Sequence, residues 1–184
     1  MQRFILTGAP GSGKTAILRQ LEADGLAVVE EAATDVIALE LAKGFAQPWT
    51  DPGFIDRVGS LQRARRLRAT AQLQVHDRSP VCTAALATFL DVPVPGALAQ
   101  DLHEIEREAI FQRRVLFVRG LGFITPTEAR RISLEDALRF ERVHEQAYLA
   151  RGYELVAIGP GRLEDRVAAV RAAMGVAIAP LRSS

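Results

Sequence analysis

An eight-residue stretch near the start of the chain constrains the fold more than any other feature. Residues 8–15 read Gly-Ala-Pro-Gly-Ser-Gly-Lys-Thr and match the pattern G-x-x-x-x-G-K-[ST] of the phosphate-binding P-loop. The apolar run 3–7 before it suits a buried strand, and residues 16–22 after it are compatible with a helix. Because a P-loop joins a strand to a helix, this context favours a true motif over a chance glycine turn.

The residues of this loop predict how it holds a phosphate. Gly8, Gly11 and Gly13 allow the backbone to turn its N–H groups inward, and the helix that follows adds partial positive charge. We expect Lys14 to reach the β- and γ-phosphates and the Thr15 hydroxyl to bind Mg²⁺. The predicted nucleotide-binding residues are Gly8, Ala9, Pro10, Gly11, Ser12, Gly13, Lys14, Thr15 and Ala16.

The size and composition of the chain are those of one ordinary domain. Of its 184 residues 48% are hydrophobic, and no apolar run is long enough to span a bilayer. No signal peptide is visible, and the single cysteine, Cys82, excludes an internal disulfide framework. We therefore expect a cytoplasmic protein that forms one domain over residues 1–184.

The charged residues bear on the choice of ligand. The net charge of +1 gives no overall attraction to nucleic acid. Lys14 and Lys43 are the only lysines, and Lys43 lies in the sequence Leu-Ala-Lys-Gly, so the guanine-recognition motif N-K-x-D is absent. We therefore expect ATP rather than GTP as the bound nucleotide.

Apolar runs and helical periods alternate along the chain. The predicted strands cover residues 3–7, 26–29, 73–77, 114–118 and 153–158. The predicted helices cover residues 14–24, 32–41, 53–71, 81–90, 98–109, 133–151 and 163–174. This alternation predicts an α/β fold with a parallel sheet and helices on both of its faces. The continuous apolar run 26–29 is typical of a strand that is buried on both faces.

The long helix predicted over residues 53–71 carries many arginines. Its expected apolar stripe is formed by Phe54, Val58, Leu61 and Leu67. Its basic residues are Arg57, Arg63, Arg65, Arg66 and Arg68. A solvated face explains these arginines better than a nucleic-acid-binding surface, because they spread around the helix and only 6% of the chain is aromatic.

Acidic and basic residues follow the predicted strands at the edge where parallel α/β sheets bind ligands. Asp77 ends the third strand and is a candidate Mg²⁺ ligand, with an ordinary helix N-cap as the alternative. Glu31, or less favourably Glu30, follows the second strand and could accept a proton from a substrate hydroxyl, unless the pair is merely solvated. Arg119 follows the fourth strand, so two acids and two arginines are expected to converge there.

Three arginines are candidates for stabilising the transferred phosphoryl group. Arg78 could clamp that group or the substrate, with an ion pair to a neighbouring carboxylate as the alternative. Arg130 and Arg131 lie in the irregular stretch 120–133, which could close as a lid over the phosphates. The alternative for this pair is a solvated position on the surface.

The motifs together resemble a known family. The P-loop, Val-Val-Glu-Glu-Ala at residues 28–32 and Asp-Arg-Ser at residues 77–79 resemble single-domain AAA-type predicted ATPases related to the kinase domain of nicotinamide-riboside kinase (NadR-like). These proteins are similar in turn to deoxynucleoside kinases. The resemblance covers residues 3–174 and implies a three-layer P-loop kinase fold, a five-stranded parallel sheet of order 2-3-1-4-5 and a lid between its last two strands.

The resemblance also implies roles for individual residues. Glu31 matches the acid that serves as a base, and Asp77 with Arg78 matches the acid–arginine pair. Gln62 falls where a glutamine of those kinases contacts the nucleobase of the acceptor. Arg130 and Arg131 match the lid arginines of those kinases by position only. Ser79 stands in place of the usual glycine, Cys82 stands near the place of a later aspartate, and the usual lid motif is absent. These departures leave the acceptor open.

The expected function is a Mg-ATP-dependent kinase that transfers the γ-phosphate to a small hydroxyl acceptor such as a nucleoside or related metabolite. The predicted catalytic residues are Lys14, Glu31, Asp77, Arg78, Arg130 and Arg131; the metal ligands are Thr15 and Asp77; the acceptor site includes Glu31, Gln62 and Arg78. The alternatives are an ATPase that switches a partner protein and, less favoured, a nucleic-acid-linked ATPase or end kinase. A nucleoside monophosphate kinase is disfavoured, because an anionic acceptor would be bound by arginines, whereas the acids Glu30 and Glu31 stand at this position. We expect a monomer or small homo-oligomer with no membrane partner.

Overall fold

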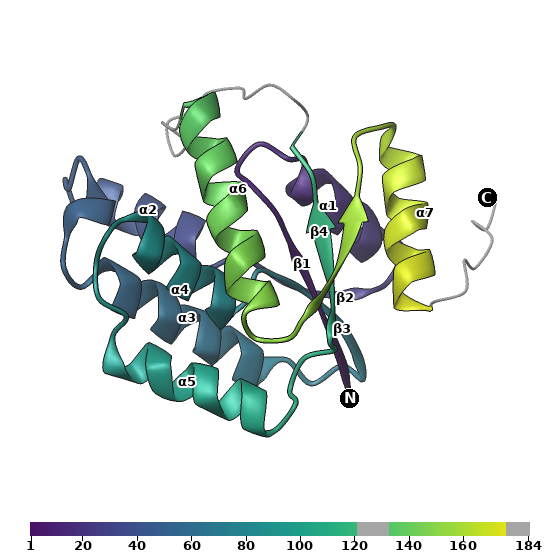
Figure 1. Ribbon diagram of the computed structural model, residues 1–184, viewed down its shortest axis with the longest axis horizontal. Coiled ribbons are helices and arrows are strands. Elements are labelled where there is room, and N and C mark those ends of the chain that lie inside the picture. The colour runs from purple at the N-terminus through teal and green to yellow at the C-terminus, as the bar shows by residue number, and fades with distance from the viewer. Residues whose placement is uncertain (121–132, 176–184) are drawn as a thin grey trace.

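A five-stranded parallel sheet forms the centre of the molecule in the computed structural model, which describes residues 1–120 and 133–175 (Figure 1). The strands are β1 (Gln2–Thr7), β2 (Ala27–Val29), β3 (Leu73–Asp77), β4 (Arg114–Val118) and β5 (Glu154–Ile158). Their order across the sheet is β2-β3-β1-β4-β5, which confirms the predicted order 2-3-1-4-5. β1 therefore lies in the middle, and the P-loop that follows it opens at the centre of the sheet.

The pairing of the strands explains which of them are buried. In β1, Phe4 lies opposite Val75 of β3, and Leu6 lies opposite Leu116 of β4. Side chains alternate between the two faces of a strand, so both faces of β1 contribute to the core. Since β2 is at the edge of the sheet, all three of its residues are only partly buried, and the expectation that it is buried on both faces is wrong.

Helices cover both faces of the sheet, as expected from the alternation of elements. They are α1 (Lys14–Ala23), α2 (Ala33–Ala42), α3 (Phe54–Arg68), α4 (Pro80–Phe89), α5 (Gly96–Arg107), α6 (Leu134–Leu149) and α7 (Leu163–Met174), with a short 3-10 helix, η1 (Pro48–Thr50). In Figure 1, α1 and α7 lie on one side of the sheet, and α3, α4, α5 and α6 lie on the other. Ser133 caps α6, because its hydroxyl accepts a hydrogen bond from the Asp136 backbone N–H at 3.0 Å.

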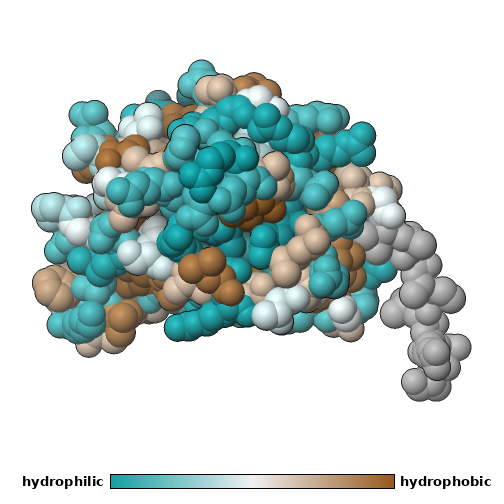
Figure 2. All heavy atoms as spheres, turned by 90° about the horizontal axis from the view of Figure 1, so that it is seen from below, coloured by the Kyte–Doolittle hydropathy of each residue, from teal (hydrophilic) through white to brown (hydrophobic). Residues whose placement is uncertain are grey.

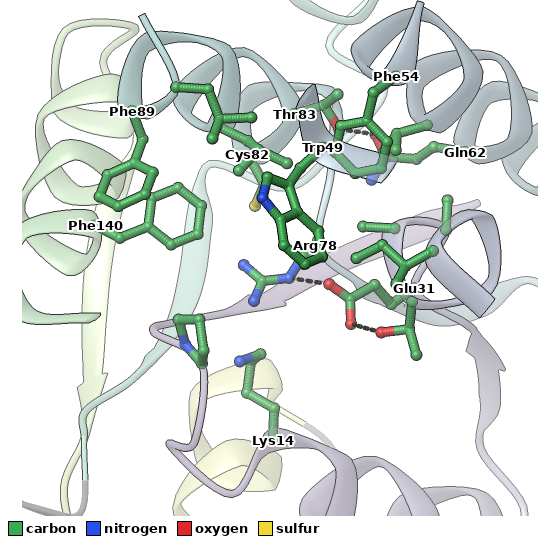
Figure 3. A pocket seen from close by; sticks show the side chains of 18 of the residues that line it. Lys14, Glu31, Trp49, Phe54, Gln62, Arg78, Cys82, Thr83, Phe89 and Phe140 are labelled. Carbon is green, nitrogen blue, oxygen red and sulfur yellow. Dashed lines mark hydrogen bonds and ion pairs between the residues drawn. The ribbon is translucent and has the colours of Figure 1, made fainter. Parts of the chain in front are cut away.

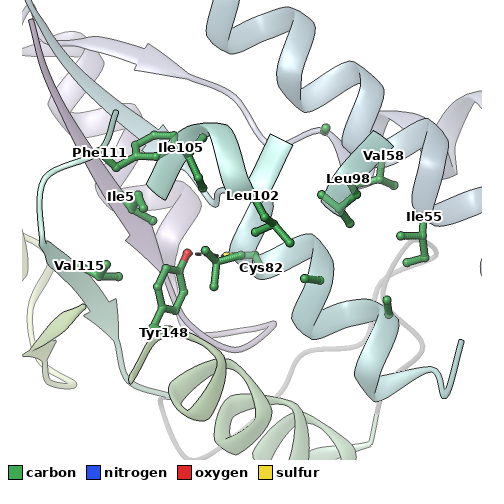
Figure 4. Packing of buried hydrophobic residues seen from close by; sticks show 14 of the residues in the cluster. Ile5, Ile55, Val58, Cys82, Leu98, Leu102, Ile105, Phe111, Val115 and Tyr148 are labelled. Atoms are coloured by element: carbon green, nitrogen blue, oxygen red, sulfur yellow. Dashed lines mark hydrogen bonds between the residues drawn. The ribbon is translucent and has the colours of Figure 1, made fainter. Parts of the chain in front are cut away.

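Two hydrophobic clusters follow from this layering. Leu6 and Leu116 point toward the side of α1 and α7, where they pack with Ile17 and Val170. Ile5 and its neighbour Val115 on β4 belong to the cluster on the other face, with residues of α3, α4, α5 and α6 (Figure 4). That second cluster is the floor against which the candidate site is built.

Helix α3 departs from its expected pattern. It ends at Arg68 instead of Ala71, and Leu67, expected in the apolar stripe, is 62% exposed. Arg66, expected on a solvated face, is buried and forms an ion pair with Asp101 of α5. Because α5 packs beside α3 and supplies this carboxylate, the arginine face is partly an interface between helices.

The face of the molecule seen in Figure 2, on the side where β1 begins, carries mainly hydrophilic residues with apolar ones scattered among them. None of the helices in the described part of the chain is both long and apolar enough to cross a membrane.

Candidate active site

The P-loop joins the end of β1 at Thr7 to the start of α1 at Lys14, as its motif predicts. Gly8 has φ 138°, and a Cβ atom on it would lie 2.1 Å from the carbonyl oxygen of Val118. Only glycine tolerates this close approach to β4. Gly13, with φ 82°, occupies the N-cap position of α1, so the loop ends at a helix N-terminus, the usual place for a bound phosphate.

Lys14 is buried against the loop itself. Its Nζ donates hydrogen bonds to the carbonyl oxygens of Gly8 at 3.0 Å and Ala9 at 2.8 Å, and to Ser12 Oγ at 3.3 Å. Burial and the charge of Arg78 lower the pKa of Lys14 to about 7, although nearby carboxylates oppose the shift. An anionic phosphate at the loop would favour the charged form of Lys14 again.

Glu31 and Arg78 form an ion pair beside the P-loop (Figure 3). Arg78 Nε donates to Glu31 Oε1 at 2.5 Å, and Thr34 Oγ1 donates to Glu31 Oε2 at 2.9 Å. Burial raises the pKa of Glu31, but Arg78 and Lys14 outweigh burial and hold this pKa below its usual value. Glu31 is therefore a carboxylate at neutral pH. The ion pair expected as the alternative role of Arg78 is present, and it lies on the wall of the cavity described below.

Asp77 ends β3 next to this pair, and its surroundings fit a metal ligand. Burial and the charge of Glu31 raise the pKa of Asp77 to about 6, while Lys14 and Arg78 oppose the shift. Its Oδ1 atom is buried and has no hydrogen-bond partner among the described residues. The N-cap position of α4 belongs to Ser79, so the alternative role expected for Asp77 as a helix cap is wrong.

The residues around Asp77 fit Mg²⁺ rather than a metal held by protein alone. The described part of the chain contains no cluster of three or more His, Cys, Asp or Glu side chains. Mg²⁺ is commonly held by one or two protein groups together with substrate phosphates. Thr15, the other predicted ligand, is exposed and lines the same cavity as Lys14.

A cavity of about 380 Å³ runs from the P-loop into the helical layer formed by α3, α4 and α6. Its near end is lined by Lys14 and Thr15, and Glu31 and Arg78 stand between this end and the far wall (Figure 3). The far wall is largely apolar and includes Trp49, Phe54, Val58, Leu86, Phe89, Leu90 and Phe140. This size is within the range of about 300–1,000 Å³ that is usual for small-molecule sites.

Gln62 lines the cavity from α3. Its Oε1 accepts a hydrogen bond from Thr83 Oγ1 of α4 at 2.9 Å, which orients the amide group at the far wall (Figure 3). The structure thus brings together six predicted site residues around one cavity, namely Pro10, Lys14, Thr15, Glu31, Gln62 and Arg78, whereas Asp77 is not among the residues that line it.

The aromatic wall was missed by sequence reasoning. Trp49 comes from η1, Phe89 from the end of α4 and Phe140 from α6, so no single motif or period connects them. The one available signal was Trp49 itself, the single tryptophan of the chain, in the Pro-rich stretch 45–52.

Arg119 was expected to converge with Glu31, Asp77 and Arg78, because it follows the fourth strand, but its side chain points elsewhere. It forms ion pairs with Glu141 at 3.1 Å and Glu145 at 2.5 Å, both on α6, and its guanidinium covers the ring of Phe117. It does not line the cavity. Arg130 and Arg131, predicted in a lid, lie outside the described residues.

Helix α6 supports the turn that carries Arg78. Arg78 adopts a left-handed backbone conformation with φ 70°, and its Nη1 donates to His144 Nε2 at 3.4 Å. The buried Tyr148 hydroxyl shares hydrogen bonds with Ser79 Oγ at 2.7 Å and with Cys82 Sγ at 3.0 Å (Figure 4). Ser79 and Cys82, two of the departures from the resembled family, are therefore joined through the hydroxyl of Tyr148.

The chain is similar to known P-loop proteins. A family model described as an AAA domain matches residues 3–166. No curated protein matches the chain. The solved structure of NadR protein in complex with NR has a TM-score of 0.66 and 19% identity, and the match covers 98% of this chain and 52% of that one. This chain therefore spans about half the length of that NadR chain.

A second solved structure is that of deoxyadenosine kinase from M. mycoides with the products dCMP and a flexible dCDP bound. It has a TM-score of 0.59 and 11% identity, and the match covers 95% of this chain and 99% of that one. At these identities the two likenesses show the fold, which is that of P-loop kinases. With the AAA-domain match, they confirm the resemblance drawn from the sequence motifs.

Proposed function

Because the chain belongs to the AAA-domain family, we propose that it is a kinase that transfers the γ-phosphate of Mg-ATP to a small hydroxyl acceptor. An ATP-dependent phosphotransferase and an ATPase, the two classes predicted from the sequence, both agree with this family and with the kinase fold. The observation that favours the kinase over the ATPase is the cavity. It extends from the P-loop to the far wall and is much larger than a site for the single water molecule that ATP hydrolysis requires.

The arrangement along the cavity supports a two-substrate site. The P-loop end holds the nucleotide phosphates, with Lys14 as the cation and with Thr15 and Asp77 as groups that would hold Mg²⁺. Mg²⁺ would supply charge neutralisation for the transferred phosphoryl group. The acceptor occupies the far end, where its hydroxyl faces the phosphates across Glu31 and Arg78.

Glu31 is suited to orient that hydroxyl. It is ionised at neutral pH, because Arg78 and Lys14 hold its pKa below the usual value, and it lines the cavity. In phosphoryl transfer such a carboxylate contributes mainly by positioning the nucleophile and accepting its proton. Arg78, which holds Glu31, also places a positive charge beside the transferred group.

The walls of the far end favour an acceptor with a flat, largely apolar body and a few polar atoms. Trp49, Phe89 and Phe140 offer aromatic surfaces, and the Gln62 amide offers a hydrogen-bonding group. The two solved structures described above hold NR and deoxynucleotides, so nucleosides are the first class of acceptor to test.

Trp49 provides a direct test of acceptor binding. It is the only tryptophan of the chain and lines the cavity, so a stacked acceptor should change its fluorescence. We expect one nucleoside-like compound in a panel both to quench Trp49 fluorescence with saturation and to raise the rate of ADP release sharply. The Lys14→Ala variant should keep the fluorescence response and lose ADP release, because the acceptor end is unchanged.

A slow ADP release that no acceptor changes, with no response of Trp49 to the panel, would contradict the kinase and favour an ATPase that switches a partner. ADP release that persists unchanged in Lys14→Ala would contradict the assignment of the P-loop itself.

A further inference from the structure

Arg166 is a buried arginine behind the P-loop that has no role in the site described so far. It lies in the first turn of α7 and is 6% exposed. Its Nη2 donates a hydrogen bond to the carbonyl oxygen of Ser12 at 2.7 Å, a contact between residues that are 154 positions apart in the chain. Because α7 lies beside α1 (Figure 1), this bond joins the last described helix to the phosphate-binding loop.

The contact determines the direction of one peptide unit in the P-loop. In a trans peptide the C=O and the N–H of the same unit point in opposite directions, and the described residues contain no cis peptide. The unit that carries the Ser12 oxygen also carries the Gly13 N–H. Since the oxygen points to Arg166, the Gly13 N–H points away from α7.

The charge of Arg166 is a second, independent observation. Among the described residues no carboxylate forms an ion pair with it, and its Nε atom is buried without a hydrogen-bond partner. A buried cation without a counter-ion is costly. A polyphosphate held by the loop, one peptide unit away, would supply the missing negative charge.

We propose that Arg166 is a positioning residue for the nucleotide polyphosphate: it holds the Ser12 carbonyl outward, presents the Gly13 N–H to the phosphates and adds positive charge behind the loop. This proposal rests on the nucleotide half of the proposed function and is independent of the acceptor.

The alternative role for Arg166 is to attach α7 to the rest of the molecule, and Arg171 offers a matched comparison. It lies on the same helix, is also 6% exposed and forms an ion pair with Asp24 at 2.6 Å. Asp24 follows the far end of α1, away from the P-loop. Both arginines thus join α7 to the α1 side, but only Arg166 contacts the loop.

The test is a calorimetric titration of Mg-ATP, Mg-ADP and inorganic triphosphate into the wild-type protein and the variants Arg166→Met and Arg171→Met. Methionine keeps much of the apolar stem and removes the donor. Arg166→Met should weaken all three ligands about tenfold, because the Gly13 N–H is no longer held toward the phosphates and the positive charge behind the loop is lost. Arg171→Met should leave the three affinities within about twofold of the wild-type values, since its contact is remote from the loop. Arg166→Lys, which retains the charge, should restore part of the loss.

Equal losses in the two methionine variants, or no loss in Arg166→Met, would overturn the proposal. If Arg166→Met does not fold, Arg166→Gln takes its place, because glutamine keeps an N–H donor but carries no charge. The Arg166→Gln protein should bind triphosphate more weakly than the wild-type protein. Tight ATP binding with no transfer to any acceptor would contradict the kinase proposed above and would leave the comparison between Arg166 and Arg171 valid.

Discussion

The chemistry proposed for this protein depends most directly on Glu31. Adjacent Glu30 is exposed, whereas Glu31 lines the cavity and is held by Arg78 and Thr34. The two neighbours have the same side chain and differ only in where the chain directs it. This difference favours Glu31 over Glu30 as the proposed carboxylate, a choice that the sequence left open.

At this scale we predict that Glu31→Gln slows phosphoryl transfer at saturating substrates by about 100-fold or more and leaves the ATP dissociation constant nearly unchanged. The amide cannot accept the proton of the acceptor hydroxyl, and it loses its charge interaction with Arg78. Steady-state kinetics combined with ATP titration measures both quantities. The matched control is Glu30→Gln, which should change the rate less than about threefold, as is usual for an exposed side chain outside the site. A full rate in the Glu31 variant would move the base role to another carboxylate.

At the scale of elements, helix α3 holds the segment that carries Glu31. Arg65 Nη1 donates hydrogen bonds to the backbone carbonyl oxygens of Glu30, at 3.3 Å, and of Glu31, and its Nη2 forms an ion pair with Asp35 of α2. The sequence predicted a solvated position for this arginine. That prediction is wrong for Arg65, although Arg68, one turn later, is exposed.

Loss of the Arg65 contacts should loosen the position of Glu31 without touching the P-loop. We predict that Arg65→Met lowers the transfer rate about tenfold, as expected when hydrogen bonds from a charged donor are lost, and leaves ATP binding intact. The control variant Arg68→Met removes an exposed arginine from the same helix. Its transfer rate and its ATP affinity should equal those of the wild-type protein. Equal rates in the Arg65 variant and the wild type would show that α3 does not position Glu31.

The elements themselves were more predictable than their contacts. Strand β3 was expected at residues 73–77 and is found there, because five consecutive residues specify a strand locally. The partner of Arg66 could not be found in this way, since Asp101 lies 35 positions further along the chain on a different helix. Similarly, the motifs indicated Lys14, Glu31 and Arg78, whereas the aromatic wall exists only after η1, α4 and α6 have packed together.

At the scale of the whole molecule, two buried histidines make folding sensitive to acid. Burial, with the charges of Arg3 and Arg66, lowers the pKa of His76 to about 3. Burial, with the charges of Arg78 and Lys14, lowers the pKa of His144 well below its usual value. Both histidines are neutral in the folded protein, and they gain protons on unfolding once the pH falls below about 6.5. Their contribution to stability is therefore complete above this pH and is lost as the pH falls.

We predict that His144→Gln reduces the slope of unfolding free energy against pH between pH 4 and 6, by up to about 1.4 kcal/mol per pH unit. The prediction concerns the difference from the wild type, because Asp77, whose pKa is raised to about 6, contributes a slope of the opposite sign in both proteins. Urea unfolding at several pH values measures the slope for each protein. His103→Gln, which changes an exposed histidine on α5, is the control and should leave the slope as it is. An unchanged slope in the His144 variant would mean that His144 is protonated in the folded protein.

The sheet order places β1 at the centre, so the P-loop, Glu31, Arg78 and the aromatic wall meet around one cavity. The central claim is that this cavity directs the γ-phosphate to an acceptor rather than to water. Phosphorus-31 NMR of the wild-type protein with Mg-ATP and the compound that quenches Trp49 fluorescence tests this claim directly. We predict that each ADP formed is matched by one new phosphomonoester, with little inorganic phosphate. Inorganic phosphate as the sole partner of ADP, with every acceptor that binds, would contradict the account.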